Sequence, residues 1–175
     1  GATPVMVPLT ASGDHDLDAM AAAITERTKL VFVCTPNNPT GTIVTDAAAR
    51  SFLAKVPADV VVVIDEAYLE FVRDPQAPDA LAVFADHPNV VLLRTFSKAY
   101  GLAGLRVGYG IGSPKLMAVI NAVKNSVNPY NVDSIAEVLA TAAVKSWDYY
   151  EDSCAKIMST RDWFSQELKA IGFDV

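Results

Sequence analysis

The sequence predicts an α/β fold built on a mainly parallel sheet that is sandwiched by helices. Short apolar runs of strand length alternate with helical segments along the whole chain. The runs are continuous rather than alternating, which is typical of strands buried on both faces. Polar and turn-forming residues directly follow them, at the carboxyl ends where parallel sheets bind their ligands. Together these observations favour a ligand-binding α/β domain.

Two expected strands lie in the first half of the chain, each preceded by a helix. A helix is predicted over residues 16–27, and the apolar run from Leu30 to Cys34 forms the first strand. The prolines, asparagines and glycine of residues 35–41 are a strong turn signal that ends it. A second helix is predicted over residues 46–55, and the valine-rich run over residues 60–64 forms the second strand, which ends at Asp65.

The second half of the chain becomes increasingly helical. A short helix is predicted over residues 79–86, followed by a third strand over residues 90–94 that ends near Thr95. Residues 108–111 form the fourth expected strand. The remaining expected helices are residues 114–127, 132–146 and 147–171.

Both ends of the sequence are expected to be cuts in a longer chain. The sequence begins with Gly1 rather than Met. Near the other end, Gly172 follows a helical stretch, as a helix-capping glycine does. The apolar Phe173 after it predicts the start of a further strand.

Composition excludes several classes of protein. The chain has 175 residues, the size of one ordinary domain. Hydrophobic residues make up 51% and charged residues 19%, which excludes long disorder. The net charge of −6 is opposite to that of a typical nucleic-acid binder. No apolar stretch approaches the ~20 residues of a membrane-spanning helix.

The number and positions of the cysteines and histidines limit the kinds of site that we expect. Two cysteines, Cys34 and Cys154, are too few for a disulfide framework. The two histidines, His15 and His87, stand apart from them, and no metal site is expected. Without a basic and apolar leader, the expected location is the cytoplasm.

Lys98 is the first candidate for chemistry, because it directly follows a buried strand and has suitable neighbours. Thr95 and Ser97 supply hydroxyls, and Arg106 lies eight residues further on. An arginine fork with hydroxyls forms a good phosphate clamp. A lysine beside a bound phosphate ester is a candidate Schiff-base lysine. The alternative is an ordinary surface lysine.

Three further polar residues follow the first two strands. Asp65 ends a very apolar run, where a carboxylate is costly unless it meets a positive group. It is either a helix cap, a structural ion-pair residue, or the partner of a ligand's ring nitrogen. Tyr68 could offer its phenol to the same ligand or pack as an ordinary aromatic. Asn38 either serves turn chemistry alone or donates to a ligand oxygen.

Three motifs carry a resemblance to a known family: PNNPTG at residues 36–41, DEAYLEF at 65–71 and RTFSKAYGLAGLRVGY at 94–109. The sequence resembles the fold-type I pyridoxal 5'-phosphate (PLP) aminotransferases, closest to the histidinol-phosphate and aromatic amino-acid branch. The resemblance runs from Val7 to Val175. It implies a large PLP-binding domain portion over residues 1–145 and the start of a truncated small C-terminal domain over residues 146–175.

The resemblance also implies roles for the residues above. Lys98 would form the Schiff base with PLP and then carry a proton, while Asp65 would bind the pyridine N–H. Asn38 and Tyr68 would bind the ring's phenolic oxygen, and Arg106 would hold the phosphate with the two hydroxyls. The implied catalytic residues are Lys98, Asp65 and Tyr68. The implied cofactor-binding residues are Asn38, Asp65, Tyr68, Thr95, Ser97, Lys98 and Arg106.

The implied activity moves an amino group between histidinol phosphate or an aromatic amino acid and a 2-oxo acid such as 2-oxoglutarate. It belongs to amino-acid biosynthesis, histidine biosynthesis included, in a homodimer. The alternatives are an amino-acid phosphate decarboxylase and a non-catalytic PLP-binding regulatory domain. The family's phosphate-binding helix and ring-stacking aromatic precede this region, and its carboxylate-binding arginine follows it. The isolated fragment is therefore expected to lack parts of a complete site.

Overall fold

The chain folds into two units, each with its own apolar core. The computed structural model describes residues 1–175, the side chain of Phe84 excepted. The first unit comprises residues 1–95 and 108–131, and the second comprises residues 96–107 and 132–175. The predicted division into domains at residue 145 stays a prediction.

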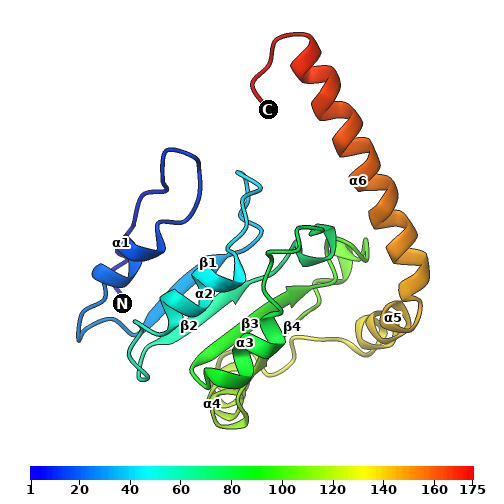
Figure 1. Cartoon of the computed structure of the whole chain (residues 1–175). Helices are drawn as coiled ribbons and strands as arrows, with labels where there is room; N and C mark the ends of the chain where they lie inside the picture. Colours follow the sequence, from blue (N-terminus) through cyan, green and yellow to red (C-terminus); the bar gives the residue numbers. More distant parts are fainter. The chain divides into compact units, whose positions relative to one another are not determined.

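The first unit contains a mainly parallel four-stranded sheet, as predicted (Figure 1). Its strands, in spatial order, are β1 (Leu30–Cys34), β2 (Val61–Asp65), β3 (Val90–Thr95) and β4 (Gly108–Gly112). The first three are parallel, and β4 is antiparallel to β3. The carboxyl ends of β1, β2 and β3 therefore meet at one edge of the sheet.

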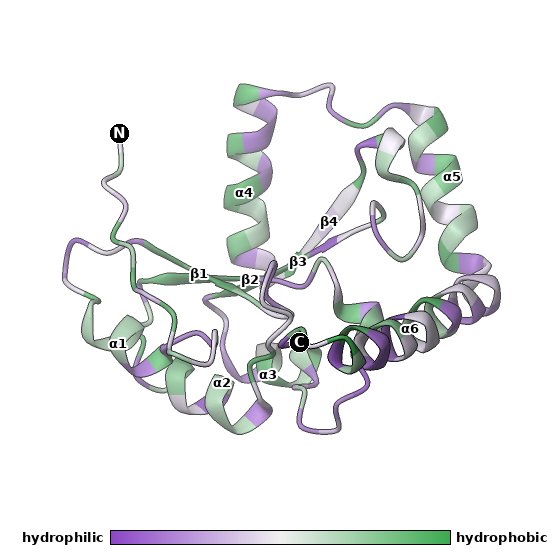
Figure 2. Ribbon diagram, turned by 90° about the horizontal axis from the view of Figure 1, so that it is seen from above, coloured by the Kyte–Doolittle hydropathy of each residue, from purple (hydrophilic) through white to green (hydrophobic). Residues whose placement is uncertain are grey.

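Helices cover both faces of this sheet (Figure 2). Three of them lie on one face: α1 (Leu17–Ala22), α2 (Asp46–Leu53) and α3 (Ala80–Asp86). On the other face lies α4 (Pro114–Val127). The core forms where Val62, Ile64 and Leu92 of the sheet meet Phe52 of α2 and Val83 of α3.

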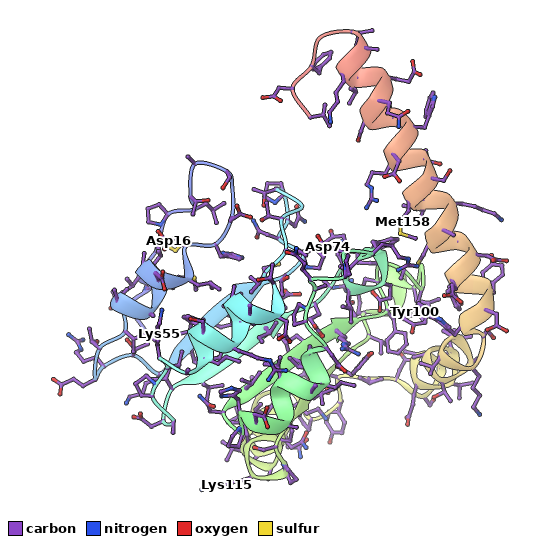
Figure 3. The ribbon with its side chains drawn as sticks, viewed as in Figure 1. Asp16, Lys55, Asp74, Tyr100, Lys115 and Met158 are labelled. Carbon is purple, nitrogen blue, oxygen red and sulfur yellow. The ribbon has the colours of Figure 1, made fainter. Side chains whose placement is uncertain are left out.

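Side-chain caps explain where the first three helices begin. Asp16 caps α1 and accepts a hydrogen bond from the Ala19 N–H at 2.8 Å (Figure 3). Thr45 caps α2, and the Asp79 carboxylate accepts hydrogen bonds from two N–H groups of α3. Each cap satisfies backbone donors that the first turn of a helix leaves unpaired.

Two expectations about the N-terminal part of the chain are wrong. The first helix was expected to reach residue 27, but α1 ends at Ala22. Beyond it, the Thr28 hydroxyl accepts a hydrogen bond from the Thr25 N–H, so side-chain bonding replaces helical bonding there. Nor is β1 buried on both faces: Leu30 is 54% and Phe32 64% exposed. The strand is at the edge of the sheet, pairs with β2 alone, and buries only the face toward α1 and α2.

The second unit is helical. It contains α5 (Ser134–Lys145) and α6 (Trp147–Ala170), together with the segment over residues 96–107. Tyr100, labelled in Figure 3, lies at the centre of an aromatic cluster. Its ring centroid is 5.0 Å from those of Phe96 and Tyr150, and 5.8 Å from that of Trp147. This cluster joins the 96–107 segment to the start of α6.

Gly172 follows α6 with a φ of +95°, in the left-handed conformation of a capping glycine. The Phe173 N–H then bonds back to the Leu168 carbonyl at 3.0 Å. This bond turns the chain back onto the helix, and residues 173–175 are not part of a strand. Within the described part of the chain, no helix is long and apolar enough to cross a bilayer.

Candidate active site

The residues predicted to bind the cofactor are divided between the two units. The first unit holds Asn38, Asp65, Tyr68 and Thr95. The second unit holds Ser97, Lys98 and Arg106. Each group has its own local geometry.

The loop after β1 is shaped by Asn37 rather than by Asn38. The Asn37 side-chain amide donates to the Thr40 hydroxyl at 2.8 Å, and its carbonyl accepts from the Gly41 N–H at 2.8 Å. Gly41 adopts a φ of +73°, which favours glycine. The Asn38 side chain is not used in this turn. Its Nδ2 instead donates to the Tyr68 hydroxyl at 3.2 Å.

Tyr68 is held at the start of a single helical turn after β2. This 3₁₀ turn is η1 (Leu69–Phe71), and the Phe71 N–H donates to the Tyr68 carbonyl at 3.1 Å. The rings of Tyr68 and Phe71 lie 6.5 Å apart between centroids. The turn therefore fixes the backbone of Tyr68 while its hydroxyl meets Asn38.

Asp65 is the last residue of β2 and is half-buried. Its Oδ1 accepts a hydrogen bond from the Ala67 N–H at 3.0 Å, which caps the turn that follows the strand. Among the described residues, Asp65 forms no ion pair. The structural ion-pair alternative for Asp65 thus has no support here. A carboxylate in this position suits a ligand that carries a positive group.

Cys34 of β1 is the register partner of Asp65, and the pKa of its thiol responds to that carboxylate. Burial raises the pKa of the Cys34 thiol, and the negative charge of Asp65 raises it further. The backbone hydrogen bond from Asn38 opposes this rise in pKa. The ends of β1 and β2 therefore hold Asn38, Asp65 and Tyr68 in one neighbourhood.

Glu66 and Arg94 form an ion pair at this edge of the sheet that was not singled out from the sequence. The Arg94 Nε donates to the Glu66 Oε2 at 2.8 Å, and Glu66 is only 2% exposed. Burial alone would lower the pKa of Arg94, but bonding to Glu66 and to the Tyr109 hydroxyl raises it. Burial raises the pKa of Glu66, against the effect of Arg94. Two adjacent carboxylates directly after an apolar strand were the available signal in the sequence.

Glu70 adds a second carboxylate close to Arg94. Its Oε2 is buried and has no hydrogen-bond partner among the described residues. Burial raises the pKa of Glu70, while the charge of Arg94 lowers it and that of Glu66 raises it. One arginine thus faces two carboxylates.

The segment over residues 96–107 in the second unit is closed at its ends. The Phe96 N–H donates to the Val107 carbonyl at 3.1 Å. Ser97 and Arg106 are each one residue inside this pair, so they lie at the same end of the loop. Lys98 follows Ser97 and is exposed.

Arg106 has an unusual backbone. Its φ is +53°, the only positive φ of a non-glycine residue in the described part of the chain. Its Nη1 donates to the Ala103 carbonyl at 2.9 Å. A side chain other than glycine in this conformation costs free energy and often marks a functional position.

The arrangement offers complementary chemistry in its two parts. The first unit supplies two groups that can donate to a ligand oxygen and a carboxylate suited to a protonated nitrogen. The second unit supplies an amine, a hydroxyl and a guanidinium, which suit an aldehyde and a phosphate.

Comparison with known proteins identifies the family to which the chain belongs. The whole chain, residues 1–175, matches the family described as aminotransferase class I and II. The chain belongs to this family. It is similar to the aromatic amino acid aminotransferase of Streptomyces avermitilis, with 49% identity over 175 residues, which are 100% of this chain and 48% of the relative.

A second relative, the aromatic amino acid aminotransferase of Corynebacterium diphtheriae, is 49% identical over 170 residues, which are 97% of this chain and 48% of the relative. The chain thus spans about half the length of the curated relatives it matches.

Solved structures agree on the fold. The histidinol-phosphate aminotransferase of Sinorhizobium meliloti in complex with pyridoxal-5'-phosphate has a TM-score of 0.81 and 33% identity, over 90% of this chain and 42% of that one. The aromatic aminotransferase of Pyrococcus horikoshii has a TM-score of 0.84, over 99% of this chain and 48% of that one. At 22% identity, this second likeness shows the fold alone.

Proposed function

We propose that the full-length protein is a PLP-dependent aminotransferase. It moves an amino group between an aromatic amino acid or histidinol phosphate and a 2-oxo acid such as 2-oxoglutarate. The observation that carries the proposal is the Asn38–Tyr68 hydrogen bond beside the Asp65 carboxylate, at the ends of β1 and β2. Membership of the aminotransferase family supports it.

The donor set of the first unit fits PLP. The Tyr68 hydroxyl and the Asn38 amide, 3.2 Å apart, can both donate to a phenolic oxygen. Asp65 has no cationic partner in the described part of the chain, so it suits the protonated nitrogen of a pyridine ring. A solved structural neighbour is named as a complex with this cofactor, which supports the assignment.

When bound, the cofactor supplies an electron sink that makes the Cα–H of an amino acid acidic. The side chains of this chain would then do the rest. Lys98 Nζ would bind the aldehyde as a Schiff-base lysine and afterwards hold and move the proton. The Asp65 carboxylate would keep the ring nitrogen protonated. Arg106 would hold the phosphate with the hydroxyls of Thr95 and Ser97.

The substrate class we favour is the aromatic amino acids. Two curated relatives with this name are each 49% identical to the chain. Histidinol phosphate stays the second candidate, because the structural neighbour with that name is 33% identical. A panel of phenylalanine, tyrosine and histidinol phosphate, each with 2-oxoglutarate, separates the two by kcat/KM. A higher value for histidinol phosphate would reverse our preference.

We also propose a cytoplasmic homodimer. The resemblance to the aminotransferase branch supports this, and apolar side chains exposed on α4, among them Val119, Val123 and Val127, are available for packing. Sedimentation of the full-length protein at micromolar concentration tests the assembly. A monomer under these conditions would contradict the dimer.

The first experiment is a titration of the full-length protein with PLP, followed by borohydride reduction and peptide mapping. We expect a visible absorption band and a covalent label on Lys98. The Lys98→Ala variant should lose both. Its matched control is Lys115→Ala, which removes an exposed lysine of α4 (Figure 3) and should keep both. Labels scattered over surface lysines, or a band that survives in Lys98→Ala, would contradict the proposal.

A further inference from the structure

We propose that the Glu66–Arg94 ion pair is a positioning device, which holds the carboxyl ends of β2 and β3 so that Asp65 and Thr95 meet the cofactor. This inference rests on the proposed function. Neither Glu66 nor Arg94 is proposed to touch the cofactor. They act through their neighbours in the chain.

The pair is interleaved with the cofactor-binding residues. Glu66 directly follows Asp65 at the end of β2, and Arg94 directly precedes Thr95 at the end of β3. Successive residues of extended chain point to opposite faces of a sheet. A bond between Glu66 and Arg94 on one face therefore fixes the spacing of Asp65 and Thr95 on the other.

Two bonds tie Glu66 to β3. Its backbone N–H donates to the Leu93 carbonyl at 2.9 Å, and its carboxylate accepts from Arg94 Nε at 2.8 Å. The first bond extends the β2–β3 ladder by one residue past the end of β2. The second bond joins the side chains of Glu66 and Arg94 across the same two strand ends. Together they prevent the two strand ends from separating or sliding.

The apolar surroundings of Glu66 keep the Glu66–Arg94 ion pair rigid. Its side chain lines a small cavity between the sheet and the helices, where the other lining groups are almost all apolar, among them Phe52, Val62 and Val83. If water replaced the arginine beside a carboxylate in such a place, the folded state would lose much free energy. The Arg94 side chain is 17% exposed, so it too has little freedom. The geometry of the pair is thus well determined.

β4 supports Arg94 from the other side. Tyr109 is the register partner of Arg94 on β4, and its hydroxyl bonds the guanidinium. Gly108 lets β4 come close, since a Cβ there would lie 2.8 Å from the Arg94 carbonyl oxygen. This bonding therefore spans β2, β3 and β4 at the edge of the sheet that holds Asp65 and Thr95.

Stability alone is a weak reason for such a pair. Buried ion pairs can often be replaced by apolar side chains of similar volume without loss of stability, whereas removal of one partner is damaging. The double variant Glu66→Leu/Arg94→Met thus separates folding from positioning. Arg94→Lys is the second variant, because it keeps the charge but loses the planar fork that bonds Glu66 and Tyr109.

The control is a surface ion pair of the same unit, between helices α2 and α3. Arg50 of α2 pairs with Asp46 at 2.8 Å and with Asp86 at 3.3 Å, and all three side chains are largely exposed. Arg50→Met removes this surface pair. It should change neither cofactor binding nor the exchange of residues 65–71.

Two measurements on the full-length protein test the proposal. Amide hydrogen exchange of residues 65–71 without cofactor reports the strand end directly. PLP titration by absorbance reports the binding site. For the double variant we expect an unchanged melting temperature, faster exchange in residues 65–71 and a Kd for PLP raised roughly tenfold, the size of loss seen when outer partners of metal ligands are removed. Arg94→Lys should show the same changes, at a smaller size.

The outcomes are separable. If the double variant folds and both its exchange and its Kd match the wild type, the positioning role is refuted. If the double variant does not fold, Arg94→Lys decides by the same two measurements. If the wild-type protein itself fails to bind PLP, the proposed function is wrong. The proposed role of the Glu66–Arg94 pair in cofactor binding is then wrong as well. That failure is recognised in the wild type alone, before any variant is compared.

Discussion

The Asn38 side-chain amide donates a hydrogen bond to the Tyr68 hydroxyl at 3.2 Å, although 30 positions separate the two residues in the sequence. The bond joins the loop after β1 to the turn after β2. In this contact the Tyr68 oxygen accepts the hydrogen bond. The bond therefore places the side chains of Asn38 and Tyr68 where both can lie close to one ligand oxygen.

Tyr68→Phe should weaken PLP binding without unfolding the protein. The change removes one hydrogen bond to the ligand and the bond to Asn38, and a neutral hydrogen bond contributes about 1 kcal/mol, or roughly fivefold in Kd. Absorbance titration with PLP measures the effect. Tyr149→Phe is the control, because Tyr149 is 70% exposed on α6. Equal Kd values for the two variants would contradict a role for the Tyr68 hydroxyl.

Much of the first unit could be predicted from sequence, because its strands are short apolar runs between turns. Predicted and observed strands agree to within one residue at each end. The exposure of β1 could not be predicted, since hydropathy shows what a strand can bury and not which neighbours cover it. Phe32 is as apolar as a core residue, yet it faces an uncovered side of the sheet.

The candidate site was predictable only in part. Asp65 and Asn38 stand out because polar residues at strand ends are few and lie within recognisable motifs. The Glu66–Arg94 pair does not stand out, because it forms between residues 28 positions apart. No spacing rule links residues of two different strands. Their pairing follows from the β2–β3 register, which only the fold provides.

Glu70→Gln should raise stability at neutral pH and not at acid pH. Burial raises the pKa of Glu70, so above the usual glutamate value of about 4.3 the folded state holds a proton that the unfolded state has lost. Stability therefore falls as pH rises through this window. The gain from Glu70→Gln should be about 1 kcal/mol or less, because water screens a half-buried charge.

Thermal unfolding of wild type and variant between about pH 4 and about pH 8 measures this difference, a range that spans the titration of carboxyl groups. Glu151→Gln serves as the control, because Glu151 is exposed on α6. The gap in melting temperature between Glu70→Gln and wild type should widen with pH. A gap that stays constant or narrows would mean that Glu70 does not titrate as its burial implies.

Gly108→Ala should destabilise the first unit. A Cβ at Gly108 would lie 2.8 Å from the backbone carbonyl oxygen of Arg94, so β4 must move away from β3. Overpacking of this kind costs roughly 1–3 kcal/mol. Gly104→Ala is the matched control, since a Cβ at Gly104 meets no atom within 4 Å. Denaturant unfolding measures both, and equal midpoints would show that the β3–β4 contact is looser than described.

Arg106→Gly should separate cofactor affinity from stability. Arg106 adopts a φ of +53°, which costs a non-glycine residue about 1 kcal/mol, so glycine there should leave stability unchanged or raise it by up to that amount. If Arg106 holds the phosphate, the same change removes a charged hydrogen bond and should weaken PLP binding roughly tenfold or more.

The comparison of PLP with pyridoxal, which lacks the phosphate, decides whether Arg106 acts on that group. Arg106→Gly should weaken PLP binding and leave pyridoxal binding unchanged, because the guanidinium has no phosphate to meet in the second case. Arg106→Lys should fall between wild type and glycine for PLP, since it keeps the charge and loses the fork. It should gain no stability, because the backbone conformation still carries a side chain. An equal loss for PLP and pyridoxal would instead mean that Arg106 shapes the 96–107 loop and does not hold the phosphate.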